Sequence, residues 1–139
     1  MIAEHVEEFR IPAIPGSEKT ARDRAGEFAT GAGFVAGRIE DIKTAVSEAA
    51  LNAIEHGVTG NASETVLIRL FRESDGVRIT VSNRGRLFAI PIDKPDMKEK
   101  IEGRSRARGW GLYLIRELAD RVSIEHEDGV TTISMKFSR

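Results

Sequence analysis

Two Asp-Gly pairs, each set between two runs of alternating apolar residues, constrain the fold of this chain more than any other feature. Asp-Gly between such runs is a strong β-hairpin signal, because these residues adopt the turn conformations that reverse a strand. The predicted strands are 65–71 and 76–82 around Asp75-Gly76, and 122–126 and 130–137 around Asp128-Gly129. The sequence therefore predicts two antiparallel hairpins.

Helical spacing of apolar residues marks three further segments. They are residues 18–30 with Ser17 as the expected N-cap, residues 38–56 followed by Gly57, and residues 112–121. In the longest, seven apolar residues form one arc suited to packing on a sheet: Ile39, Ile42, Val46, Ala49, Ala50, Ala53 and Ile54. A short strand at 6–11 precedes all three. This order predicts an α+β fold, a two-layer α/β sandwich whose mixed, mostly antiparallel sheet carries the helices on one face.

The length of 139 residues allows one domain, so residues 1–139 are expected to form a single unit. Hydrophobic residues at 40% and charged residues at 31% are globular values, which argue against a disordered tail. The absence of cysteine excludes a disulfide scaffold, a thiolate metal site and a cysteine nucleophile.

Charge and hydropathy limit the cellular compartments and the classes of binding partner that fit this chain. The chain has 21 basic and 22 acidic side chains, a balance that disfavours binding to nucleic acid through phosphate neutralisation. Residues 1–10 carry three glutamates and lack the apolar region of a secretory signal. No stretch reaches the roughly 20 apolar residues of a membrane helix. We therefore expect a cytoplasmic protein with no direct nucleic-acid or membrane partner.

Glu48 and Asn52 lie one turn apart on the 38–56 helix, on a different side from its apolar arc. A carboxylate can orient or deprotonate an attacking hydroxyl, and an amide oxygen is a hard ligand suited to Mg²⁺. The alternative is that both belong to the solvated face of an amphipathic helix, where an Asn gains nothing locally. His56, in the last turn, is better explained by the helix dipole than by metal binding.

Residues 84–108 interrupt the regular pattern with two prolines, two glycines, eight basic and four acidic residues. A loop of this length is uncommon in a small domain unless it is functional or mobile. It begins within the turn sequence Asn83-Arg84-Gly85 and leads into Gly109-Trp110-Gly111, directly before the last helix. Glycines at a helix start let backbone N–H groups approach an anion closely. Since Gly-x-Gly is a common sequence and a basic run is usually just solvated, a phosphate site and an ordinary loop both remain open.

Taken in order, three segments resemble the N, G1 and G2 boxes of the GHKL, or Bergerat-fold, ATPases. They are Val46 to Gly57 (VSEAALNAIEHG), Asn83 to Gly85, and Gly109 to Gly111. Within this superfamily the chain resembles the anti-sigma-factor serine/threonine kinases over essentially its whole length. The resemblance implies a histidine-kinase-like ATPase domain that binds ATP and Mg²⁺, with residues 84–108 as the ATP lid.

The resemblance also implies roles for individual residues. Glu48 corresponds to the general base and Asn52 to the Mg²⁺ ligand at the triphosphate. Asn83 and Gly85 correspond to the turn under the adenine, and Thr132 to a threonine near the same ring. The other nucleotide-binding positions would lie at the phosphates: Arg108, Gly109, Trp110, Gly111 and Leu112.

Two positions depart from the family pattern. Asn83 stands where the G1 box normally opens with Asp, whose carboxylate accepts a hydrogen bond from the adenine amino group. An amide oxygen accepts the same bond without charge assistance, at a cost on the order of 1 kcal/mol. Ala107 stands where many members carry a further glycine of the G2 box.

The function implied by the resemblance is that of an ATP-dependent protein serine/threonine kinase acting as an anti-sigma factor in partner switching. Its implied partners are a sigma factor and an anti-anti-sigma protein of the STAS type, which carries the acceptor serine, and a homodimer would form through the N-terminal strand and helix. The alternative is a non-catalytic binding module on the same fold with weak or lost ATP binding, which Asn83 favours. A third reading, DNA binding through the arginine-rich loop, predicts a steep loss of affinity with salt.

Overall fold

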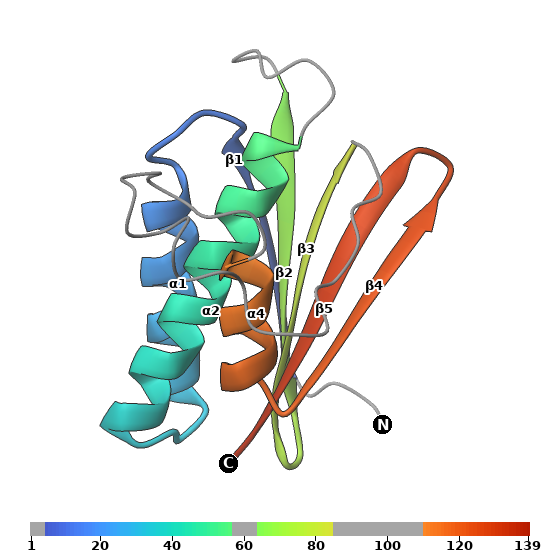
Figure 1. Ribbon diagram of the computed structural model, residues 1–139. Coiled ribbons are helices and arrows are strands. Elements are labelled where there is room, and N and C mark those ends of the chain that lie inside the picture. Colours follow the sequence, from blue (N-terminus) through green and yellow to red (C-terminus); the bar gives the residue numbers. More distant parts are fainter. Residues whose placement is uncertain (1–4, 57–63, 85–109) are drawn as a thin grey trace.

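The computed structural model describes residues 5–56, 64–84 and 110–139, which form two layers (Figure 1). One layer holds the helices α1 (Glu18–Gly31), α2 (Ala36–Glu55) and α4 (Trp110–Leu118). The other is a five-stranded sheet of β1 (His5–Pro12), β2 (Thr65–Glu73), β3 (Gly76–Arg84), β4 (Arg121–Glu127) and β5 (Val130–Ser138). All three helices cover the same face of the sheet, which confirms the expected α+β sandwich.

The strand order is β1-β2-β3-β5-β4, and each of the four strand pairs in the described part of the chain is antiparallel. The expected mixed sheet is thus wrong in this detail. β3 and β4 do run in the same direction, but β5 lies between them and pairs with both. The hairpin partner β5 therefore separates the two strands that run in the same direction.

The core lies between the two layers. Helix α2 packs between α1 and α4, and its predicted apolar arc is buried, with Ile39 partly buried at the edge. The strands bury every second side chain towards the helices, as Val77, Ile79 and Val81 of β3 illustrate. The alternating pattern that predicted the strands therefore also built the core. None of the described helices is long and apolar enough to cross a membrane.

The two predicted hairpins are confirmed, although their turns differ. Asp128 and Gly129 both have positive φ, 54° and 77°, as a tight two-residue hairpin turn requires. In the other hairpin the turn is Ser74-Asp75, and Gly76 already belongs to β3. A Cβ atom on Gly76 would lie 2.0 Å from the carbonyl oxygen of Phe137 in β5. Gly76 is therefore needed for close strand approach and not for the turn.

Two expected helix ends are also corrected. The Ser17 side chain makes no capping hydrogen bond; instead the carboxylate of Glu18 accepts one from the N–H of Gly16 at 2.7 Å. The last helix was expected to reach Arg121, yet it ends at Leu118 and Arg121 opens β4. The N–H of Asp120 donates to Lys136 of β5 at 2.8 Å, so sheet pairing ends the helix. The expected glycine cap, Gly57, lies outside the described residues.

Candidate functional site

Helix α2 places Asn52 and Glu48 on the side that faces α4. Arg38, Ala45 and Asn52 are seven residues apart, so they form one stripe along the helix. Arg38, at the start of this stripe, donates a hydrogen bond to the carbonyl of Leu118 in α4 at 2.6 Å. The stripe therefore faces α4, with the partly buried Glu48 at its margin. This position contradicts a fully solvated face, because Asn52 is only 6% exposed.

The amide of Asn52 is poised for a ligand. Its Nδ2 atom is buried and has no hydrogen-bond partner among the residues that the structure describes. A buried polar group without a partner costs roughly 1–3 kcal/mol, so it calls for one, such as an ordered water, an ion or a ligand. One amide offers both a donor to a phosphate oxygen and an oxygen for a hard cation. The residue present thus fits a metal-bound phosphate.

Asn83 lies against α2 from the end of β3, at Ala53, the residue after Asn52. Its Nδ2 donates to the carbonyl of Ala53 and to that of Arg84, both at 3.1 Å, and the residue is 8% exposed. These two bonds use both amide protons. The Oδ1 atom is left as an acceptor, the same hydrogen-bonding role that a carboxylate would have at this position.

A row of three polar side chains crosses the sheet at the same end. Asn83 of β3 is opposite Thr131 of β5, which is opposite His126 of β4. Thr131 is 1% exposed, and its hydroxyl is 2.8 Å from Nδ1 of His126. The predicted Thr132 lies on the opposite face, where its hydroxyl is hydrogen-bonded to Ser82 at 2.9 Å.

The structure therefore places Thr131, and not the predicted Thr132, on the sheet face that Asn83 occupies. The alternation of the strand could have predicted this face. Every second residue of a strand points to the same side, so Thr131 points the same way as the buried apolar residues Ile133, Met135 and Phe137, which face the helices. A threonine at such a position must point to the helix side, where Asn83 also lies.

The start of α4 supplies the third part of the site. Gly111 and Leu112 are buried in its first turn, and the Trp110 ring packs edge-on against Tyr113 with centroids 5.5 Å apart. A helix N-terminus presents backbone N–H groups and a positive partial charge, which favour an anion. Residues 85–109 lie outside the described part of the chain. They include most of the expected lid, Ala107, and three predicted site residues: Gly85, Arg108 and Gly109.

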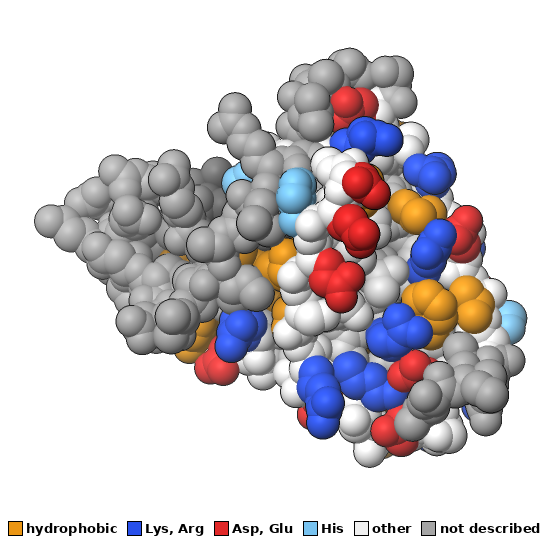
Figure 2. Space-filling view, turned by 90° about the vertical axis from the view of Figure 1, so that its right-hand side faces the viewer, with side chains coloured by type: hydrophobic (Ala, Val, Ile, Leu, Met, Phe, Trp, Pro, Cys, Tyr) orange, Lys and Arg blue, Asp and Glu red, His pale blue; other side chains and the backbone are white. Residues whose placement is uncertain are grey.

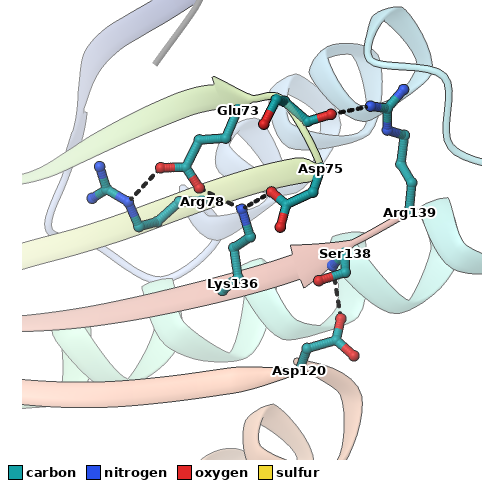
Figure 3. A network of polar contacts seen from close by, with 8 residues as sticks. Glu73, Asp75, Arg78, Asp120, Lys136, Ser138 and Arg139 are labelled. Atoms are coloured by element: carbon teal, nitrogen blue, oxygen red, sulfur yellow. Dashed lines mark hydrogen bonds and ion pairs between the residues drawn. The ribbon is translucent and has the colours of Figure 1, made fainter. Parts of the chain in front are cut away.

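A second polar cluster lies at the other end of β3, on the sheet face opposite the helices (Figures 2 and 3). The buried carboxylate of Glu73 binds Lys136 at 2.5 Å and Arg78 at 3.2 Å, and Lys136 also binds Asp75 at 2.7 Å. Burial raises the pKa of Glu73, but the hydrogen bonds from Lys136 and Arg78 outweigh it and hold the pKa below its usual range.

This cluster borders a groove of about 640 Å³, which is separate from the Asn52 site. The seven steps from Gly76 to Asn83 span about 23 Å along β3 at a strand rise of 3.3 Å per residue. The three charges at its centre are paired with one another, as in a structural network. We therefore assign the cluster to stability and not to the chemistry of the Asn52 site.

Comparison with known proteins agrees with the geometry. The chain matches the model of the histidine kinase-like ATPase domain over residues 11–137. It is 33% identical over 135 residues to the serine-protein kinase RsbW of Oceanobacillus iheyensis, a match that covers 94% of this chain and 85% of that protein. RsbW of Bacillus subtilis is 30% identical over 135 residues, covering 94% of this chain and 84% of that protein.

A solved structure shows the same fold. The RsbU and RsbW domains of a Mycobacterium tuberculosis protein match with a TM-score of 0.66 at 23% identity, over 97% of this chain and 33% of that longer chain. The sequence match covers all the described site residues, from Glu48 on α2 to Thr131 on β5. The chain therefore belongs to the histidine kinase-like ATPase family, among relatives named serine-protein kinase RsbW.

Proposed function

We propose that this chain is an ATP-dependent protein serine/threonine kinase that acts as an anti-sigma factor in a partner-switching system. The observation that carries the proposal is that Asn83 of β3 bonds to the carbonyl of Ala53, next to the buried Asn52 on α2, while α4 packs along the same helix. The similarity to serine-protein kinases named RsbW supports the type of reaction.

Asn52 and Asn83 would hold the two ends of the nucleotide. The Oδ1 atom of Asn83 would accept a hydrogen bond from the adenine amino group, with Thr131 in the same row and Gly85 in the adjoining turn. The amides of Gly111 and Leu112, with Arg108, Gly109 and Trp110, would bind the phosphates. Asn52 would bind Mg²⁺, which neutralises charge on the triphosphate when bound.

Glu48 would act on the protein substrate. It lies one turn from Asn52, so a serine hydroxyl aligned with the γ-phosphate would come within reach of its carboxylate. The carboxylate orients this hydroxyl and accepts its proton as the oxygen bonds to phosphorus and ADP leaves. Catalysis in this scheme depends mainly on alignment and charge stabilisation.

The partners of this kinase would be a sigma factor and an anti-anti-sigma protein of the STAS type that carries the acceptor serine. Such partners would place the activity in the cytoplasm and in the regulation of transcription.

We infer a homodimer through β1 and α1, because β1 is an edge strand of the sheet and Val6 on it is 49% exposed. Analytical ultracentrifugation of the purified wild type and of Val6→Arg tests the dimer. We expect the wild type to sediment as a dimer and the variant as a monomer. A wild type that stays monomeric at all concentrations would refute the dimer.

Calorimetric titration with Mg-ATP tests the nucleotide site. A dissociation constant in the range of about 1–100 μM supports the kinase, which corresponds to roughly 5.5–8 kcal/mol of binding free energy. No heat at millimolar nucleotide would instead support the alternative, a binding module on the same fold that has lost ATP.

The Glu48→Ala variant tests the catalytic assignment. We expect it to abolish phosphate transfer to an anti-anti-sigma protein while nucleotide affinity stays nearly unchanged, because Glu48 acts on the acceptor hydroxyl. Transfer is measured with γ-labelled ATP, and Glu55→Ala, an exposed carboxylate on the same helix, is the control. Equal transfer by Glu48→Ala and the wild type would remove Glu48 from the mechanism.

A further inference from the structure

Arg38, in the first turn of α2, holds the far end of α4. Its guanidinium donates to the carbonyl of Leu118 at 2.6 Å and binds the carboxylate of Asp120, the residue two positions later, at 2.5 Å. It also binds Asp41 on its own helix at 3.2 Å and lies over the buried Phe137 ring, 5.3 Å from its centroid. Arg38 is therefore fixed by α2 and β5 and in turn fixes the end of α4.

The partner Asp120 is itself held in place. The N–H of Ser138 donates to its carboxylate at 2.8 Å (Figure 3), and this bond, together with Arg38 and against the effect of burial, keeps the pKa of Asp120 below its usual range. Asp120 is thus an ionised anchor tied to β5. Through it, the end of α4 is connected to the sheet as well as to α2.

Helix α4 needs such an anchor. It has only nine residues, and isolated helices of that length are not stable in water, so tertiary contacts must hold it. Its apolar contacts, through Leu112, Ile115 and Leu118, are not directional and resist sliding along α2 only weakly. The bond from Arg38 to the Leu118 carbonyl is directional, so it defines where along α2 the helix ends.

Because α4 is a helix of fixed length, the position of its C-terminal end determines the position of its N-terminal end. The two helices lie side by side and run in opposite directions (Figure 1). Nine residues of α-helix span about 13 Å, and the same distance along α2 from Arg38 reaches about the level of Glu48. The N-terminus of α4 therefore lies at about the level of Glu48, and Asn52 lies one helical turn further along α2.

From this geometry we propose that Arg38 is a positioning residue of the phosphate site. It sets the axial position of α4 on α2, and so places the N-terminus of α4, with the N–H groups of Gly111 and Leu112, near Glu48 and one turn before Asn52. The inference rests on the proposed function, since it assumes that these N–H groups bind the nucleotide phosphates. Arg38 touches neither the nucleotide nor the acceptor in this scheme.

The test compares Arg38→Met with Arg78→Met in the full chain. Arg78 is a close match, because it also lies over a phenylalanine ring (Phe71, 4.0 Å) and binds a carboxylate (Glu73), but it lies on the sheet face opposite the helices and makes no described hydrogen bond or ion pair to α4. Affinities for Mg-ATP and for adenosine are measured by calorimetry for both variants. Adenosine lacks phosphates, so its affinity reports the base site alone.

We expect Arg38→Met to weaken Mg-ATP binding about tenfold, because small misplacement of binding groups is costly, while adenosine binding changes less than about twofold. Arg38→Lys, which can still donate to the Leu118 carbonyl, should recover part of the loss. Arg78→Met should change neither affinity. Equal weakening of both ligands by Arg38→Met, no weakening at all, or no recovery by lysine would overturn the proposal.

Amide hydrogen exchange separates this proposal from the proposed function. In the protein without nucleotide, Arg38→Met should make the amides of residues 112–118 exchange at least about tenfold faster and leave those of α1 unchanged. Unchanged exchange in α4 would overturn the positioning role. If the wild type bound no nucleotide, the proposed function would fail, while the exchange measurement would still decide whether Arg38 holds α4.

Discussion

At the scale of the single residue, Asn83 shows how one amide can replace a carboxylate. Both of its amide protons are used by the carbonyls of Ala53 and Arg84, so the side chain cannot present a donor to the base. An acceptor at this position matches the amino group of adenine and not the carbonyl of guanine. In the proposed adenine site, the departure from the family pattern would preserve the direction of the hydrogen bond and lose only its charge.

We predict that Asn83→Asp tightens ATP binding and weakens the fold. The carboxylate forms a stronger, charge-assisted bond to the adenine amino group, worth about 1 kcal/mol or roughly fivefold in affinity. The same change removes both bonds to backbone carbonyls and should lower the free energy of unfolding by about 1–3 kcal/mol. Calorimetry and urea denaturation measure the two effects separately. Unchanged or weaker ATP binding would mean that this turn holds adenine in another way.

Thr131 and Thr132 form a second residue-scale pair, because adjacent strand residues face opposite sides of the sheet. We predict that Thr131→Val weakens ATP binding about fivefold, through loss of a hydroxyl beside Asn83, whereas Thr132→Val leaves it unchanged. The two substitutions remove the same atoms, so each controls for the other in one calorimetric series. A larger effect at Thr132 would restore the sequence-based assignment.

At the scale of the element, the start of β3 depends on a close approach to the backbone of β5 at Gly76. A side chain on Gly76 would collide with the Phe137 carbonyl, which is backbone and cannot move without breaking the β3–β5 ladder. We predict that Gly76→Ala lowers the free energy of unfolding by about 3 kcal/mol or more, measured by urea denaturation. Gly37→Ala is the matched control.

Gly37 lies in the first turn of α2, and a Cβ atom there would have nothing within 4 Å among the described residues. Alanine is the better helix former, so the control should be neutral or stabilising by up to about 1 kcal/mol. A Gly76→Ala protein as stable as Gly37→Ala would contradict the prediction, because it would show that β3 and β5 can separate at Gly76 at little cost in free energy.

At the scale of the whole molecule, the cluster around Glu73 ties three strands together. Its carboxylate comes from β2, Arg78 from β3 and Lys136 from β5 (Figure 3). Because the folded-state pKa of Glu73 is lowered, its contribution to stability is full above the pKa of the unfolded chain. It is lost as the pH falls through the lower, folded-state pKa.

We predict that Glu73→Gln makes the chain less stable at pH 7, by about 2 kcal/mol, and less sensitive to acid below about pH 4.5. Urea midpoints from pH 7 to pH 3 measure both effects. Asp23→Asn is the control, since its carboxylate also has a lowered pKa but lies in an exposed pair with Arg22. Such pairs contribute little, so its profile should follow the wild type. Parallel profiles for Glu73→Gln and the wild type would contradict the prediction.

The amino-acid sequence by itself determined the elements and the first part of the site. Periods of two and of 3.6 residues are local, so the hairpins, the helices and the pairing of Glu48 with Asn52 could be predicted from the chain alone. The sequence also predicted a turn at Asn83, yet Asn83 and Arg84 pair with β5 as part of β3, and Gly111, expected to precede the last helix, lies in its first turn.

The tertiary structure decided what depends on contacts distant in sequence. Strand alternation defines two faces, but only the packing of helices on one of them shows that Thr131, not Thr132, lies beside Asn83. The insertion of β5 between β3 and β4 and the grip of Arg38 on Leu118, 80 residues away, are of the same kind. Such contacts follow from how whole layers pack, because no local period encodes which distant element a side chain will meet.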